Sequence, residues 1–260
     1  MIDDYSLKSL FLIPAISMAR VGTCLYITPF FSNSLLTGAV RNGTILSLSL
    51  MVVPIVEKGM PADATVIGTA VIVAKEAFLG LILGYVASAP FWVASNIGYF
   101  VDTQRGTGMA SIFDPNLGEQ TSPLGQFLLQ VLVTLFYAGS GILMFLGILY
   151  ESFRLMPVFT FFPIIDTRLP VYILGFTDQF MSLIVVLSAP MIVAMFLVDF
   201  SLGLVGRFAP SLNVFFLSMP VKSGIAFLIL ILYSTTLMTA LRGDYINYDS
   251  LRALFSIFSK

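Results

Sequence analysis

Histidine is absent from this sequence, cysteine occurs once, and charged residues make up only 10% of its 260 positions. With Cys24 as the only thiol, the chain cannot form an internal disulfide, and it lacks the ligands of most zinc, haem and iron–sulfur sites. It also lacks the side chain that most often serves as a general base near neutral pH. We therefore expect no metal, no cofactor and no enzymatic activity.

The chain carries too little charge to cover the surface of a water-soluble domain. Soluble domains have about 25% charged residues, whereas 58% of this chain is hydrophobic. The net charge of −1 gives no electrostatic basis for binding nucleic acid. The composition indicates an integral membrane protein in contact with lipid. Its acidic start, Met1-Ile2-Asp3-Asp4, is unlike the basic start of a cleaved leader.

Six apolar runs are candidates for spanning helices, which need about 20 residues; the second of them is short for a crossing. They cover residues 10–31, 44–56, 64–101, 124–150, 172–198 and 214–241. The third run contains Lys75 and Glu76 and is too long for one straight crossing. We expect Pro90 to kink it or to end a helix near Ala89. Pro210 should break the helix that precedes it.

The remaining features of the chain complete the expected fold. Basic residues are scattered over all the loops, so the bias that orients most membrane proteins is weak. This favours an unusual topology, although a permease with a noisy bias would look the same. Residues 244–260 have apolar positions at helical spacing. We expect one all-α unit over 1–260, with helical hairpins and broken helices over 1–243 and a short amphipathic helix over 244–260.

Four charged side chains fall inside or at the end of apolar segments, where they are costly unless they face partners or water. They are Arg20, Lys75, Glu76 and Asp199. Because Lys75 and Glu76 are adjacent, we expect them to point in different directions and to need separate partners. For Arg20, which lies in the middle of an apolar run, we favour pairing with another helix or another subunit. Lys75 could equally lie at a bilayer edge and reach water.

Small residues recur at helical spacing in the third apolar run. Gly80 and Gly84 form a G-x-x-x-G pattern, and Ala77 and Ser88 extend the same face. Such spacing lets two helix backbones approach closely, so we expect a tight helix–helix contact, although the pattern also arises by chance. Close packing is expected at four more glycines, which are Gly139, Gly141, Gly203 and Gly206.

A polar stretch ends the third run and precedes a loop that mixes glycine, proline and acid with apolar residues. Asp102 and Arg105 are three positions apart and share a helix face. Gly106 lets the backbone turn sharply. We expect Asp102, Gln104, Arg105 and Gly106 to hold the base of the loop.

Three stretches together resemble the export-apparatus family of type III secretion systems, named SctT, SpaR, YscT or EscT in virulence systems and FliR in flagella. The first is residues 39–42, after 29–31. The second runs from residue 90 to 106, with 114–115 and 121–122 after it. The third, residues 203–224, contains R-x-A-P-x-x-N followed by a lysine and is the most specific. The resemblance covers nearly the whole chain and is closer to the virulence branch.

The resemblance implies a subunit of the export gate in the bacterial inner membrane. Family members join SctR and SctS subunits, as a single copy, in a narrow complex that passes unfolded proteins. The complex adjoins SctU and the inner rod or needle base. The implied fold is a stack of helical hairpins within the basal body, partly on the periplasmic side. Neighbouring protein would then surround the charged helices, which fits the weak charge bias.

By the same resemblance, the loop after Arg105 faces the central pore and helps to close it. Met109, Ile112 and Phe113 would form a deformable apolar tip. An apolar constriction blocks ions and water by dewetting. We predict that these three residues plug the resting channel. The alternative is that they pack into a neighbouring subunit as ordinary core.

The break at Pro210 and the charges in apolar segments are the expected assembly contacts. Arg207 and Asn213 could satisfy backbone groups freed at the break, or could pair with Asp199. The full set of expected contacts is Arg20, Lys75, Glu76, Asp199, Arg207, Pro210, Asn213 and Lys222.

Two other functions fit part of the sequence. A small-molecule or ion transporter would explain prolines at 90, 190 and 210, because carriers use discontinuous helices. No internal repeat supports that interpretation. The third possibility is a membrane scaffold without a pore.

Overall fold

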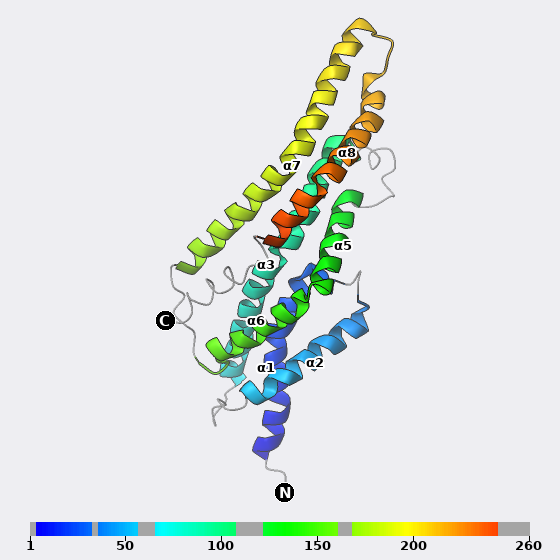
Figure 1. Ribbon diagram of the computed structural model, residues 1–260. Coiled ribbons are helices and arrows are strands. Elements are labelled where there is room, and N and C mark those ends of the chain that lie inside the picture. The colour runs from blue at the N-terminus through cyan, green and yellow to red at the C-terminus, as the bar shows by residue number, and fades with distance from the viewer. Residues whose placement is uncertain (1–3, 33–35, 57–65, 108–121, 161–167, 244–260) are drawn as a thin grey trace. The chain divides into compact units, whose positions relative to one another are not determined.

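The computed structural model describes residues 4–32, 36–56, 66–107, 122–160 and 168–243. Within these ranges the chain is all-α, as predicted, with seven α-helices, one short 3-10 helix and no strand (Figure 1). The expected amphipathic helix over 244–260 lies outside the described residues. The elements are α1 Asp4–Ile27, η1 Pro29–Phe31, α2 Gly38–Val56, α3 Val66–Arg105, α5 Pro123–Ala138, α6 Gly141–Leu155, α7 Arg168–Phe208 and α8 Val214–Gly243.

Four of the helices in the described ranges are long and apolar enough to cross a membrane, namely α2, α3, α7 and α8. The pair α5 and α6 makes a fifth candidate if it is counted as one span. The four long helices contain few charged residues, and fewer than half of the residues in their most apolar windows are buried inside the chain. The protein is therefore an integral membrane protein of long helices.

The third apolar run forms one continuous helix. α3 has 40 residues and passes through Pro90. The prediction that a helix could end near Ala89 is wrong. Proline removes one backbone hydrogen bond, but Ala89, Pro90 and Phe91 are all buried, so packing supports the helix there. α7 likewise continues through Pro190.

The fourth apolar run, in contrast, is broken. α5 and α6 meet at an angle of 76° across residues 139–140, so the single helix expected over 124–150 is wrong. Ser140 has φ 61°, in the left-handed region that non-glycine residues seldom adopt. A Cβ at Gly141 would collide with the ring of Phe136. This glycine therefore permits the bend, and the close packing predicted for it is confirmed.

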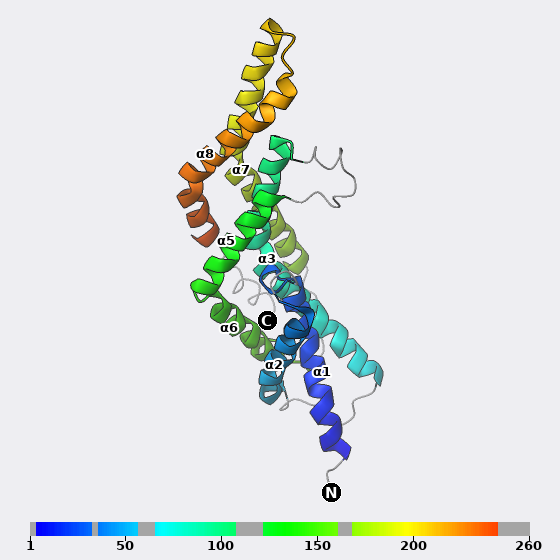
Figure 2. The same ribbon diagram turned by 90° about the vertical axis from the view of Figure 1, so that its right-hand side faces the viewer.

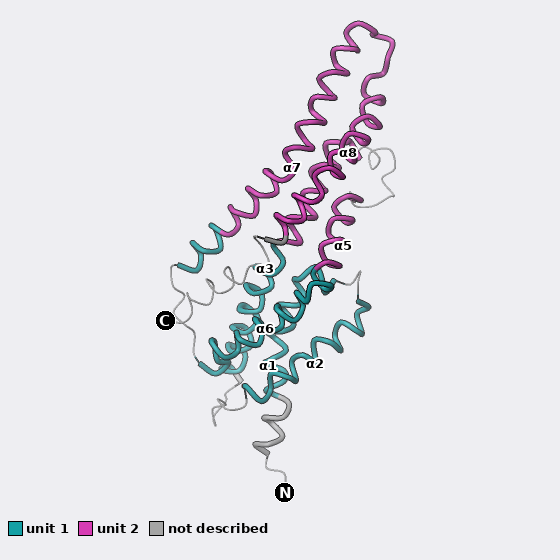
Figure 3. Tube along the Cα trace, viewed as in Figure 1, with its two compact units in different colours: residues 1–89, 136–175, 246–260 teal, residues 90–135, 176–245 magenta. Residues whose placement is uncertain are grey.

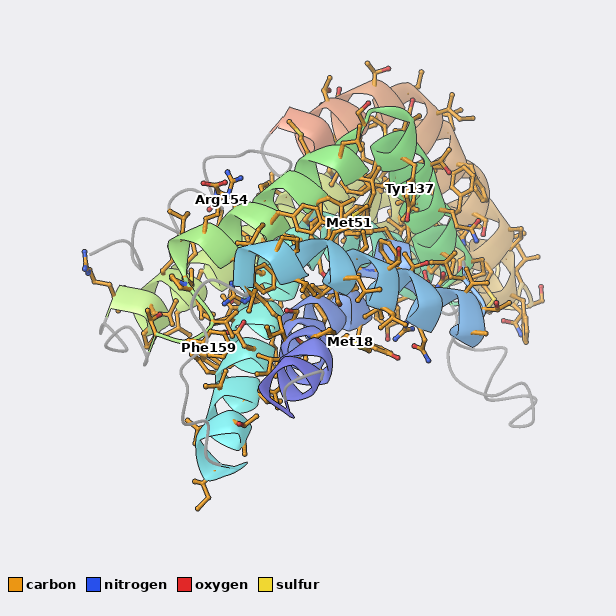
Figure 4. The ribbon with its side chains drawn as sticks, turned by 90° about the horizontal axis from the view of Figure 1, so that it is seen from below. Met18, Met51, Tyr137, Arg154 and Phe159 are labelled. Carbon is orange, nitrogen blue, oxygen red and sulfur yellow. The ribbon has the colours of Figure 1, made fainter. Side chains whose placement is uncertain are left out.

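Aromatic rings fill the inside of this bend. The ring centroid of Phe30 lies 4.7 Å from that of Phe136 and 5.1 Å from that of Phe145. Tyr137 (Figure 4) donates a hydrogen bond of 2.9 Å to the Phe30 carbonyl. The short helix η1 thus fixes the junction of α5 and α6.

The chain divides into two compact units that alternate along the sequence (Figure 3). Unit 1 consists of Met1–Ala89, Phe136–Gly175 and Ile246–Lys260, and unit 2 of Pro90–Leu135 and Phe176–Tyr245. α3, α5 and α7 each contribute residues to both units.

In unit 1, the small-residue face of α3 contacts the backbone of α1. A Cβ on Gly80 would overlap the Arg20 carbonyl, and a Cβ on Gly84 would lie 2.7 Å from the Cys24 carbonyl oxygen. Ser88 Oγ lies 3.3 Å from the Ile27 carbonyl oxygen, to which it donates. The predicted G-x-x-x-G contact is confirmed.

In unit 2, two glycines that the sequence analysis did not single out bring α3 and α5 together. A Cβ on Gly98 would overlap the backbone of Gly125, and a Cβ on Gly125 would lie 2.7 Å from the Ser95 carbonyl oxygen. By contrast, a Cβ at Gly203 would meet nothing within 4 Å. The close packing predicted at Gly203 is therefore wrong within this chain.

α7 and α8 form an antiparallel hairpin, side by side in both views (Figure 1, Figure 2). α7 ends at Phe208, two positions before Pro210, as predicted. The turn is closed by backbone hydrogen bonds, including Leu212 N–H to the Ala209 carbonyl at 3.1 Å. Many large apolar side chains on this hairpin are exposed.

The contact between Gly98 and Gly125 is testable by a matched pair of substitutions. Gly98→Ala should destabilise the isolated chain by about 1–3 kcal/mol, because the added methyl group overpacks a backbone contact. Gly203→Ala makes the same change in an open position, and should be neutral or stabilising by about 1 kcal/mol through helix propensity. Thermal unfolding in mild detergent measures both. Equal unfolding temperatures would contradict the assigned contact.

Candidate functional site

The first buried charge network surrounds Arg20, which is fully buried in the middle of α1. Its Nε lies 2.6 Å from Glu76 Oε2 on α3. Its Nη1 donates to the Ser152 carbonyl at 2.8 Å, and its Nη2 donates to the Met156 carbonyl at 2.9 Å. The guanidinium stacks over the Phe153 ring, 4.1 Å from the centroid. One side chain therefore joins three helices of unit 1.

Lys75 completes this network from the position beside Glu76. Its Nζ is 3.0 Å from Glu76 Oε1, an ion pair without hydrogen-bond geometry. It donates to the carbonyls of Val158 at 2.6 Å, Thr160 at 3.2 Å and Pro157 at 3.3 Å. Each residue has the separate partner that was predicted, Arg20 for Glu76 and backbone carbonyls for Lys75. The two side chains also pair with each other, which was not predicted, because the flexible lysine stem folds back to its neighbour. Lys75 is buried rather than extended to water.

This network places two cations and one carboxylate at the end of α6. The last carbonyls of a helix lack intrahelical partners, and the negative end of the helix dipole attracts cations. Arg20 binds the Ser152 carbonyl in the last turn of α6 and the Met156 carbonyl just after it. Lys75 binds the carbonyls of Pro157, Val158 and Thr160 in the segment that follows, so carbonyl dipoles offset the excess positive charge. The pairing joins helices within one chain. A role in contacts between subunits stays a prediction for Arg20, Lys75 and Glu76.

The second network lies in unit 2, where α3 ends. Gly106 has φ 89°, which favours glycine. Its N–H donates to the Thr103 carbonyl at 3.1 Å, and Thr107 N–H donates to the Asp102 carbonyl at 3.2 Å. These two bonds form the Schellman motif that ends many helices. The sequence therefore sets the point at which the chain leaves α3.

The carboxylate of Asp102 joins the end of α3 to the start of α5. It accepts hydrogen bonds from Arg105, from Ser122 Oγ at 2.7 Å and from Leu124 N–H at 2.9 Å. Ser122 Oγ in turn accepts from Gly125 N–H at 2.9 Å. Together the two side chains satisfy two of the free N–H groups at the start of α5. Asp102 is almost fully buried.

The four predicted loop-base residues thus lie on the last turn of α3 and its exit. The predicted tip, Met109, Ile112 and Phe113, lies outside the described residues. The sequence analysis missed Ser122 as a partner of Asp102. The sequence did contain a signal for this role. Ser122 stands directly before Pro123, and serine is a preferred N-cap while proline is a preferred first helical residue.

Lys222 of α8 also contacts this turn. Its Nζ lies 2.8 Å from Asp199 Oδ1, 3.0 Å from Asp199 Oδ2 and 3.1 Å from the Gln104 carbonyl oxygen. Asp199 therefore pairs with Lys222, and the suggested pairing with Arg207 or Asn213 is wrong.

The remaining predicted assembly residues lie at the turn of the hairpin. Arg207, Pro210 and Asn213 are all exposed. Within the described part of the chain, Arg207 has no hydrogen-bond or ion-pair partner. The same part contains no group of three His, Cys, Asp or Glu side chains that could hold a metal ion.

Comparison with known proteins identifies the class to which this helical membrane protein belongs. The chain matches the family described as bacterial export proteins, family 1, over residues 11–246. It is 39% identical over 245 residues to the Yop proteins translocation protein T of Yersinia pestis, covering 94% of each chain. It is 34% identical over 220 residues to the surface presentation of antigens protein SpaR of Salmonella typhimurium, covering 84% of this chain and 81% of SpaR.

A flagellar protein belongs to the same set of relatives. The flagellar biosynthetic protein FliR of Bacillus subtilis is 30% identical over 185 residues, covering 70% of this chain and 71% of FliR. The chain belongs to the bacterial export protein family, the SctT family that its three stretches predicted. It is a component of an export apparatus of this kind.

The buried network in unit 1 gives a second matched test. Glu76→Gln should destabilise the chain by about 3–5 kcal/mol, because Arg20 and Lys75 would be left buried without a counter-charge. Glu151→Gln is the control. Glu151 pairs at 3.6 Å with Arg154 on the exposed outer side of α6 (Figure 4), and such surface pairs contribute about 0–1 kcal/mol. Thermal unfolding of both variants measures the loss of stability. Similar losses in the two variants would contradict the network.

Proposed function

We propose that this chain is a subunit of the type III secretion export gate in the bacterial inner membrane. In this proposal it assembles with SctR and SctS into the channel for unfolded proteins, adjoins SctU and the inner rod or needle base, and lies partly on the periplasmic side. Residues 1–260 act as one unit. This is supported by α3, α5 and α7, which each belong to both compact units.

The observation that carries the proposal is the exposed apolar surface of α7. The helix has 41 residues and is about 60 Å long at 1.5 Å per residue. The hydrocarbon core is about 30 Å thick, so even a tilt of about 40° would place only about 26 residues within it. Exposed apolar side chains run from Val171, 69% exposed, to Phe208, 87% exposed. Part of this surface lies beyond the lipid and needs protein neighbours.

The neighbouring hairpin helix supports the same conclusion. α8 is the least buried of the four candidate spans, with 17% of its most apolar window buried inside the chain. Ile231 and Leu232 are 72% and 77% exposed. A carrier that works alone would bury more of such a helix in its own bundle. In this proposal Arg207 and Asn213, which are exposed at the turn between α7 and α8, contact a neighbouring subunit.

The second part of the proposal is that the loop after Arg105 closes the channel. Thr107 Oγ1 donates to the Asp102 carbonyl at 2.8 Å, and Ser122 Oγ donates to the Asp102 carboxylate at 2.7 Å. Because both ends of the loop are tied to Asp102, the tip can be displaced without unfolding α3 or α5. The apolar residues Met109, Ile112 and Phe113 suit a tip that excludes water and yields to a passing chain.

Assembly is tested by affinity purification of this chain in mild detergent, expressed with its neighbouring genes, followed by native mass spectrometry. We expect one copy bound to several copies each of two other small hydrophobic proteins. A carrier would instead purify alone or as a homo-oligomer. A lone monomer or homodimer, under conditions that preserve known membrane complexes, would overturn the proposal in favour of the transporter.

Closure is tested in the assembled complex by replacing Met109, Ile112 and Phe113 with glycine and serine. Ion conductance of the resting complex should rise, because the dewetted constriction would become polar. The control exchanges three exposed apolar residues of α8, Leu228, Ile231 and Leu232, for other apolar residues, and should leave conductance unchanged. Normal assembly with unchanged conductance in the tip variant would show that these residues are not the plug.

A further inference from the structure

Lys222 stands out because three oxygens of unit 2 lie within 3.1 Å of its ammonium nitrogen. An ammonium has three N–H donors, and three oxygens surround this one, namely both carboxylate oxygens of Asp199 and the carbonyl oxygen of Gln104. The lysine side chain is only 12% exposed. Lys222 therefore holds α8, α7 and the end of α3 at one point.

The end of α3 depends on this contact for one of its free carbonyls. The carbonyls of Asp102 and Thr103 are bound by Thr107 and Gly106 within the Schellman motif. The next carbonyl, that of Gln104, accepts a hydrogen bond from Lys222 of α8. A cation at a helix C-terminus is also stabilised by the helix dipole. The last turn of α3 is thus completed by another helix.

A second contact joins the same two helices. The Arg105 guanidinium lies over the ring of Phe227, 5.1 Å from its centroid. Arg105 also binds the carboxylate of Asp102, which caps the start of α5. A shift of α8 would therefore act on Gln104 through Lys222 and on Asp102 through Arg105.

We propose that Lys222 is a positioning residue that couples the α7–α8 hairpin to the junction between α3 and α5. When the hairpin is in place, Lys222 completes the last turn of α3, and Asp102 holds the start of α5. When the hairpin moves, the turn loses its lysine and loosens. The inference rests on the proposed function only in that this junction carries the proposed channel loop.

The coupling is measured by hydrogen–deuterium exchange of the full chain in its purified complex. Lys222→Met removes the charge and the donors but keeps an apolar stem. Exchange at the amides of Gly106 and Thr107 should become about tenfold faster, the ratio expected for losing a hydrogen bond to a charged group. Exchange at the amides of Leu124 and Gly125 should also become faster. The amide of Met156, in unit 1, should not change.

Three further variants separate positioning from a general loss of stability. Lys222→Arg retains a charged donor and should restore slow exchange. Asp199→Asn removes the ion pair but leaves the bond to Gln104, and should accelerate exchange less than Lys222→Met. Val221→Met introduces the same side chain at the adjacent exposed position, and should have no effect. If Lys222→Met does not accumulate, Lys222→Gln serves in its place.

Unchanged exchange at Gly106 and Thr107 in a folded Lys222→Met complex would overturn the inference, whatever happens to conductance. Equal acceleration in both units would also overturn it, because Lys222 would then be a general stabiliser. Faster exchange at the junction supports the coupling. The channel loop is decided separately by the conductance of the tip variant, so the coupling can stand even if the proposed channel loop falls.

Discussion

The fold depends on satisfying backbone carbonyls at helix ends that are buried or partly buried. Without water nearby, each unpaired carbonyl costs several kcal/mol. This chain solves the problem with cations from distant helices. Arg20 binds the end of α6, Lys75 binds the segment directly after it, and Lys222 binds the end of α3. The charges of these two networks meet where α6 and α3 stop, and each of these two ends becomes a junction between several helices.

The two junctions differ in their charge balance. In unit 2, Asp102 and Asp199 balance Arg105 and Lys222. In unit 1, Glu76 faces both Arg20 and Lys75, so carbonyl dipoles must provide the remaining stabilisation. A single carboxylate there serves two cations, which makes unit 1 the less tolerant of losing an acid. Unit 2 can lose one contact of Lys222 and retain another.

Much of the fold followed from residue patterns. The long apolar runs predicted the helices, Pro210 marked the end of α7, and the spacing of Gly80 and Gly84 predicted the contact with α1. The break after Ala138 was missed, because no charge or proline marks it and the cluster Gly139-Ser140-Gly141 was not weighed as a turn signal. The pairing of Lys222 with Asp199 was also missed, since residues brought together by a hairpin have no fixed spacing in sequence. The role of the loop tip stays a prediction.

The length of α7 also matters for how the protein is made. A helix about 60 Å long that exposes phenylalanine, leucine and valine along its whole length cannot be kept from water by lipid alone. A newly inserted copy would hold its apolar end in an aqueous compartment until neighbours covered it. Its lifetime in the cell would therefore depend on the supply of those neighbours, and copies made in excess would be exposed to aggregation and to membrane proteases. Stoichiometry would then be enforced after synthesis, by the instability of unassembled chains.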